Sequence, residues 1–369
     1  MLVFFVLKSI LLFFLVFSGY FISIKNKNGK YKYPYWWAAS FPLIIYSLVE
    51  GLRYGRGADY LSTKSLIVNA FRQDVSSIEP LFLSFNKFLN YLNIPYPFAF
   101  MMYSFLLMGS CLLLIRNRRA IAGWALPLFY LATIGQSENL VRQFAAFSFI
   151  LLGIKFMLEN ERSKFLFFII CAFFTHYSSI VVLPFLLWFK IARNPFRNIY
   201  IILGLYVASV LWIPNLESTA KYFNYLRFFN LYGNYLDRTD VWLLGVGIKK
   251  TVSVMSSVFY IRYYLFPLLV LIYGYRILDK YRYSGFSLFY HLFFIGILFR
   301  QISSAAATEM LYRLTLYFSM FYFIVLAFIL YDMFINYKRL SFLHKVALYY
   351  FLIDCSYLLL KTTWTFSVE

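Results

Sequence analysis

The sequence predicts an all-α integral membrane protein that crosses the bilayer many times. Of its 369 residues, 62% are hydrophobic, 23% are aromatic and only 14% are charged, and the mean hydropathy is +0.69. Soluble domains carry about 25% charged residues, so this composition excludes that class. Apolar runs long enough to approach or cross the ~30 Å hydrocarbon core recur from one end of the chain to the other.

Apolar runs define the expected membrane segments. The first run has no basic segment before it, since Lys8 lies inside it, and no small-residue cleavage site, so we expect a retained span and not a signal peptide. The three cysteines lie within runs and lack paired spacing, which is typical of small buried residues and not of a zinc or redox site. The runs cover residues 2–24, 34–52, 95–115, 120–134, 139–158, 165–189, 199–213, 251–275, 285–300, 311–336 and 343–360.

Short basic connectors predict how the chain is oriented. They cover residues 25–32, 116–119, 161–164, 190–197, 275–283 and 336–345. The formal net charge of +20 gathers largely in these connectors, which favours membrane orientation and anionic lipid over nucleic acid. If basic connectors stay inside, five of the six fit single crossings. The run 165–189 is the exception, because one span there would place two connectors on opposite sides.

We therefore expect residues 165–189 to form a hairpin that turns at THYSS, residues 175–179. Each limb of about 11–13 residues gives roughly 16–20 Å of helix, which is short of the ~30 Å core. The turn is thus expected below the outer surface. This hairpin brings the total to about twelve membrane segments in a single polytopic domain, residues 1–369.

The same topology places the polar segments of interest on the outer face. An outer loop, residues 53–94, contains RYGRGADY and an amphipathic helix. GQSEN, THYSS and RQISSAAATEMLYR lie on this side too, as does an aromatic and basic loop at 214–250 with Lys221, Arg227 and Arg238. That loop fits a sugar site or a lid over a lipid, and equally an interfacial aromatic belt. The basic outer face suits an anion.

Residues 76–92 have apolar side chains at helical spacing, which predicts a helix in the outer interface. Ser77 fits its N-cap and Pro80 its first turn. Glu79 is either a helix-terminus carboxylate or a catalytic group. Just upstream, Arg53, Arg56 and Asp59 crowd around two glycines, which fits a ligand-binding loop or a solvated turn with internal ion pairs.

ENLVRQ, residues 138–143, would place Glu138, Asn139, Arg142 and Gln143 on one helical face. Arg142 could then pair with Glu138 while its guanidinium still offers donors to a phosphate, or the pair could be purely structural. His176 sits at the hairpin tip, and TEMLYR repeats the pattern with Glu309 and Arg313. The sequence has no Walker A, GxGxxG, HExxH or CxxC motif, so we expect no soluble nucleotide donor and no metal.

The order of these elements resembles the EpsG family of bacterial polysaccharide polymerases, which are related in role to the Wzy polymerases of O-antigen and capsule. The resemblance covers about residues 45–320. Ser179 stands where the family commonly has alanine. The matching positions are Arg53, Gly57, Asp59, Tyr60, Glu79, Asn139, Arg142, Gln143, His176, Ser178, Arg313 and Tyr317.

The resemblance implies a GT-C-like enzyme that joins undecaprenyl-pyrophosphate-linked repeat units at the outer face of the bacterial cytoplasmic membrane. Arg142 and Arg313, with Arg53 or Arg56, would bind the pyrophosphate, and Asn139, Gln143 and Ser178 would assist. The base would be one of Asp59, Glu79 and His176. No cofactor is implied. The expected partners are the lipid-linked oligosaccharide and membrane lipids, with a chain-length regulator and a flippase.

Two other classes of function remain open from the residues. A flippase or transporter also uses arginines within the membrane, but it should show internal repeats and polar residues at mid-membrane depth. Another membrane transferase, such as a ligase or an O-acyltransferase, is the second alternative. An acyltransferase should pair a histidine with a carboxylate.

Overall fold

The computed structural model describes residues 2–53, 55–57, 59–72, 78–192, 196, 198–212, 261–305 and 309–365. These residues fold into helices, and no strand occurs among them, which confirms the all-α prediction. The α-helices are α1 (Leu2–Ser23), α2 (Tyr35–Gly51), α3 (Tyr60–Val68), α4 (Pro80–Tyr91), α5 (Tyr96–Ile115), α6 (Ala122–Thr133), α7 (Gln136–Asn139), α8 (Val141–Leu158), α9 (Arg162–Thr175), α10 (Val182–Ala192), α11 (Ile199–Leu211), α16 (Phe266–Ile277), α17 (Phe286–Ala305), α18 (Glu309–Ser319), α19 (Tyr322–Ile335) and α20 (Phe342–Thr365). Short 3₁₀ or π turns are η1 (Ala70–Arg72), η2 (Arg116–Ile121), η3 (Tyr177–Val181), η5 (Ile261–Leu265), η6 (Arg282–Ser284) and η7 (Tyr337–Arg339).

Several of these helical stretches are long and apolar enough to cross a membrane. Within the described residues they are Val3–Ser23, Tyr96–Thr133, Val141–Leu158, Phe286–Ser303, Tyr312–Ile335 and Phe342–Leu360. Tyr177–Ile191 and Ile199–Leu211 are apolar but shorter. The chain is therefore a multi-pass membrane protein, as predicted.

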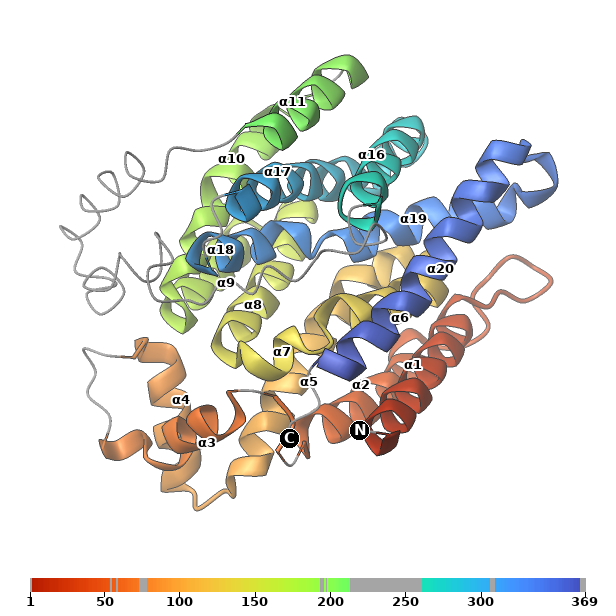
Figure 1. Cartoon of the computed structure of the whole chain (residues 1–369). Coiled ribbons are helices and arrows are strands. Elements are labelled where there is room, and N and C mark those ends of the chain that lie inside the picture. The colour runs from red at the N-terminus through yellow and green to blue at the C-terminus, as the bar shows by residue number, and fades with distance from the viewer. Residues whose placement is uncertain are drawn as a thin grey trace. The chain divides into compact units, whose positions relative to one another are not determined.

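The helices divide between two compact units. The first unit comprises residues 1–183 and 326–369. In it, α1 packs against α2 and α6, α2 against α5, α5 against α8, and α8 against α9. The last helix, α20, lies beside the first, α1, and also contacts α6 (Figure 1). Gly19 allows α1 to approach α6 closely, because a Cβ there would lie 2.4 Å from the Ala122 carbonyl oxygen.

The second unit comprises residues 184–325. Its helix α17 packs against α11, α16 and α18. Phe185, Phe299 and Phe318 pack edge to face, with ring centroids 5.2–5.8 Å apart. The candidate span Tyr312–Ile335 is interrupted, since α18 ends at Ser319 and α19 begins at Tyr322.

Two local features of the first unit position the candidate site. Helix α4 packs against α3 and α9 and buries Phe82 and Leu89 of the predicted apolar face, together with Leu83. Phe88 and Leu92, which share the predicted spacing, are exposed. It begins at Pro80, which confirms the predicted proline in the first turn, and Glu79 occupies the N-cap position, so the prediction of Ser77 as the cap is wrong. The predicted break within 165–189 is present, because His176 is extended at φ −160° and ψ 111° between α9 and η3.

Candidate active site

The glycine-containing loop, residues 55–57, approaches α7 closely. Gly57 has φ +101°, a conformation that favours glycine. A Cβ on Gly57 would lie 2.7 Å from the Glu138 carbonyl oxygen and 3.0 Å from Asn139 Oδ1. Only glycine fits here, so the RYGRGADY and ENLVRQ segments meet at Gly57.

ENLVRQ does not form one continuous helix. Helix α7 ends at Asn139, Leu140 has φ −99° and ψ 52°, and α8 begins at Val141. The i, i+4 relation between Glu138 and Arg142 therefore does not hold. The predicted ion pair between these two residues is wrong, and each has other partners.

Glu138 belongs to a buried network of charges in the first unit. Its Oε2 lies 3.2 Å from Lys8 Nζ of α1, and its Oε1 lies 3.4 Å from Arg56 Nη1. The same Arg56 nitrogen lies 3.8 Å from Glu50 Oε1, to which Tyr130 donates a hydrogen bond. The side chains of Lys8, Glu50, Arg56 and Glu138 are at most 4% exposed. Charges so deeply buried require partners of opposite sign, and the two cations and two carboxylates of this network pair with one another.

Arg53 is also buried. It is 6% exposed, its Nη1 donates to the Ser137 carbonyl oxygen at 3.3 Å, and its guanidinium lies 4.7 Å from the centre of the Phe100 ring. Arg56 donates in addition to the Val49 carbonyl oxygen. Both arginines of the loop thus bind protein groups in the interior. Sequence reasoning missed Lys8, the partner of Glu138, and Glu50, the partner of Arg56, although an ionisable residue inside an apolar run is the signal that points to them.

A second, more exposed cluster brings together three residues that the sequence singled out. Glu79 Oε2 lies 2.8 Å from Arg142 Nη1, and Glu79 Oε1 lies 2.5 Å from His176 Nδ1. Glu79 precedes α4, Arg142 lies in the first turn of α8, and His176 follows α9. The packing of α4 on α9 and of α9 on α8 holds these elements together.

The electrostatics of the cluster keep Glu79 ionised. Burial raises the pKa of its carboxyl, but the hydrogen bond from His176 and the charges of His176 and Arg142 outweigh burial and lower the pKa from 4.5 to about 2. The Glu79 side chain is 6% exposed, whereas those of His176 and Arg142 are 19% and 33% exposed. The histidine and the arginine therefore form the accessible part of the cluster, with the carboxylate beneath them.

The other predicted site residues lie in varied surroundings. Asp59 is exposed at the start of α3, and the ion pairs of the described residues do not include it. Gln143 is buried next to Arg142, and Asn139 and Ser178 are partly buried near Glu138 and His176 in the chain. Arg313 is partly buried on α18 of the second unit. The side chain of Glu309 and the loop 214–250 lie outside the described residues.

This arrangement can perform acid–base and anion chemistry. A carboxylate that holds one ring nitrogen of a histidine leaves the other nitrogen to take or give a proton. An arginine beside it supplies positive charge and several N–H donors. Among the described residues, no group of three or more His, Cys, Asp or Glu side chains is arranged to hold a metal ion.

Fold and site together define a polytopic all-α membrane protein in which one buried carboxylate joins a histidine and an arginine from distant segments. The model of the EpsG family matches residues 35–366, so the chain belongs to the EpsG family. The resemblance seen in the sequence motifs is thereby confirmed. Membership indicates a membrane protein of polysaccharide biosynthesis, of the polymerase type. No curated protein and no solved structure matches the chain.

Proposed function

We propose that this protein is a polymerase that joins undecaprenyl-pyrophosphate-linked oligosaccharide repeat units during the synthesis of a surface polysaccharide. The observation that carries the proposal is the cluster of Glu79, Arg142 and His176. The reaction needs a base for the attacking sugar hydroxyl and a cation for the departing pyrophosphate. The cluster offers both, since the Glu79 carboxylate holds His176 and Arg142 side by side.

His176 is the base in this proposal. With its Nδ1–H donating to Glu79, the lone pair lies on Nε2, which takes the proton of the acceptor hydroxyl. The hydroxyl oxygen then bonds to the anomeric carbon of the donor sugar. The bond from that carbon to the pyrophosphate oxygen breaks, and undecaprenyl pyrophosphate leaves with the electron pair. Glu79 stays ionised, orients the ring and stabilises the imidazolium that forms.

Arg142 binds the leaving pyrophosphate. One of its terminal nitrogens lies 2.8 Å from Glu79, and the guanidinium has other N–H groups to offer. Its side chain is one-third exposed, which gives a ligand access. Charge that develops on the leaving oxygen is what a fixed guanidinium stabilises most.

Arg53 and Arg56 have a different role in this proposal from the one first expected. Their burial among Glu50, Glu138 and backbone carbonyls makes them a scaffold beneath ENLVRQ instead of ligands of the pyrophosphate. We retain Arg313, Asn139, Gln143 and Ser178 as substrate-binding residues and Asp59 as a second acidic group for the acceptor.

We further propose the setting of the reaction. The site would lie on the outer face of the cytoplasmic membrane, in a GT-C-like chain with about twelve membrane segments, and would work beside a flippase and a chain-length regulator. A reporter that is active only outside the cytoplasm, fused at Gly135 or Ser178, should be active. The same reporter at Asn117 should be silent. Silence at Ser178 would contradict the outer placement of His176.

Deletion of the gene in the native host tests the function itself. Gel analysis of the surface polysaccharide should show a single repeat unit in place of a ladder, and the wild-type protein should restore the ladder. Complete loss of surface sugar would point to export and contradict the proposal.

A further inference from the structure

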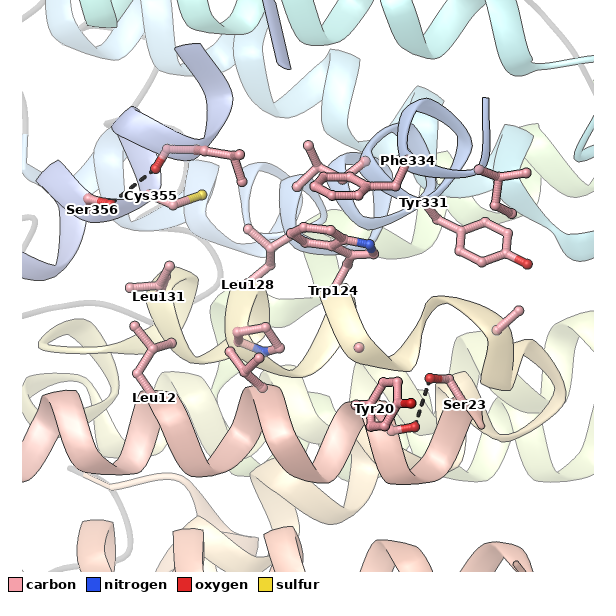
Figure 2. A pocket seen from close by; sticks show the side chains of 17 residues that line it. Leu12, Tyr20, Ser23, Trp124, Leu128, Leu131, Tyr331, Phe334, Cys355 and Ser356 are labelled. Carbon is pink, nitrogen blue, oxygen red and sulfur yellow. Dashed lines mark hydrogen bonds between the residues drawn. The ribbon is translucent and has the colours of Figure 1, made fainter. Parts of the chain in front are cut away.

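An apolar pocket of about 660 Å³ lies in the first unit, away from the residues of the candidate active site. It is bounded by α1, α6, α19 and α20, and Figure 2 shows side chains from these helices facing one another across it. Its volume falls within the roughly 300–1,000 Å³ of small-molecule sites. Its lining includes Leu12, Tyr20, Trp124, Leu128, Phe334 and Cys355.

The pocket extends over about half the thickness of a membrane. Along α1 its lining reaches from Leu12 to Ser23, a rise of about 16 Å at 1.5 Å per residue. The hydrocarbon core of a bilayer is ~30 Å thick. A lipid chain that fills the pocket lengthwise therefore extends through one leaflet of the bilayer.

One end of the pocket meets three basic connectors. The lining at this end includes Ser23, Ala120 and Ile335. In sequence they lie within two residues of the connectors 25–32, 116–119 and 336–345, respectively. Arg116, Lys338 and Arg339 of these connectors are exposed. An apolar chain with an anionic head at this end would match both the lining and the charge.

This basic end is opposite to the candidate active site along α8. Asn117 of the connector 116–119 donates a hydrogen bond of 3.1 Å to Glu159, which follows α8 directly. Arg142 lies in the first turn of the same helix, about 25 Å from Glu159 at 1.5 Å per residue. A pyrophosphate held by Arg142 is therefore not the head group at the basic end.

We propose that this pocket binds an acyl chain of an anionic phospholipid, whose head group lies against Arg116, Lys338 and Arg339. This acyl chain would contact α1 together with α19 and α20. Helix α1 precedes the family-matched residues 35–366. The lipid thereby fastens α1, which carries Lys8 of the buried network, to the end of the chain. Binding of this lipid is independent of the proposed polymerase reaction.

Native mass spectrometry of the full-length protein in detergent tests the proposal, with phosphatidylglycerol, phosphatidylethanolamine and undecaprenyl phosphate as probes. We expect one tightly retained phosphatidylglycerol and weaker phosphatidylethanolamine. Cys355→Phe, which fills the pocket, should reduce retention at least tenfold, and the double change Lys338→Gln with Arg339→Gln several-fold. Ile10→Phe, on an exposed part of α1, and Arg162→Gln with Arg282→Gln are the matched controls and should bind as wild type.

Ser356→Phe gives a second filling variant if Cys355→Phe does not elute as a folded protein. Ser356 lines the pocket and is exposed on α20, so a larger side chain there displaces no buried group. Equal retention of both phospholipids, or retention unchanged in the filling variants, would overturn the proposal. Displacement of phosphatidylglycerol by undecaprenyl phosphate from the wild-type protein would also overturn it and assign the pocket to the substrate chain.

Discussion

Glu138→Gln should destabilise the protein more than any other single change of charge in the buried network. Glu138 is fully buried and contacts two cations, Lys8 at 3.2 Å and Arg56 at 3.4 Å. Neutralising it leaves both cations, and the nearby Arg53, with Glu50 as the one remaining carboxylate of the network. Removal of one partner from a buried pair costs about 3–5 kcal/mol, because the other charge stays buried and loses its compensation.

The double change Lys8→Met with Glu138→Gln should recover part of that loss, since it removes one charge of each sign. The unfolding temperature of both variants is measured in detergent, from the loss of the monodisperse peak after heating. The matched control is the exposed pair Lys164 and Glu161, whose neutralisation should cost less than about 1 kcal/mol. A Glu138→Gln protein as stable as wild type would contradict a stabilising role for Glu138, as would a double variant less stable than the single one.

Three further outcomes are expected, two from the Glu79 cluster and one from Ser179. Arg142→Lys should lower polymerisation about 10- to 100-fold, and Arg142→Ala more, because a charge-assisted hydrogen bond contributes roughly 1.5–3 kcal/mol; normal ladders from Arg142→Lys cells would contradict this. The folded pKa of Glu79 is about 2, below its ordinary 4.5, so its stabilisation of up to about 3 kcal/mol is present above pH 4.5 and is lost as pH falls toward 2. The melting temperature in detergent should accordingly fall less in Glu79→Gln than in wild type as the pH is lowered from 4.5 toward 2. Ser179→Ala should melt at the wild-type temperature or above, because the Ser179 hydroxyl is buried and has no hydrogen-bond partner among the described residues; a loss of stability would show a partner for it.

The helices were largely predictable because their signal is local. Apolar runs bounded by basic connectors give α1, α2, α5, α8, α11 and α20 within a few residues of their observed ends. The break at THYSS followed from a mismatch between charge and span length. The division at Ser319 was not predicted, because no proline or glycine marks it in the sequence.

The pairing of the charged residues was not predictable from spacing. Lys8 and Glu138 are 130 residues apart, and Glu79 and His176 are 97 apart. Helical spacing predicted Arg142 to pair with Glu138, and the non-helical Leu140 between them prevents it. Tertiary packing decides such contacts, and the sequence gives only the residue types that take part.

Each of the three cluster residues had nonetheless been singled out on its own. Glu79 stood at a helix start, Arg142 at the head of a span and His176 at a predicted turn, because polar side chains at the ends of apolar helices are uncommon and costly. What the sequence left open was the choice of base. The burial of Glu79 beneath His176 supports His176 as the base.

The proposed role of His176 as the base of a polymerase is tested most directly by the variant His176→Asn. The amount of long-chain polysaccharide that it makes is measured in the deletion strain, with protein level checked in the membrane fraction. General-base catalysis contributes about 10²- to 10⁴-fold, so we expect at least a hundredfold loss of long chains while single repeat units remain. His344→Asn, the same substitution outside the cluster, should give the wild-type ladder. A normal ladder from His176→Asn would contradict the role of His176 as the base.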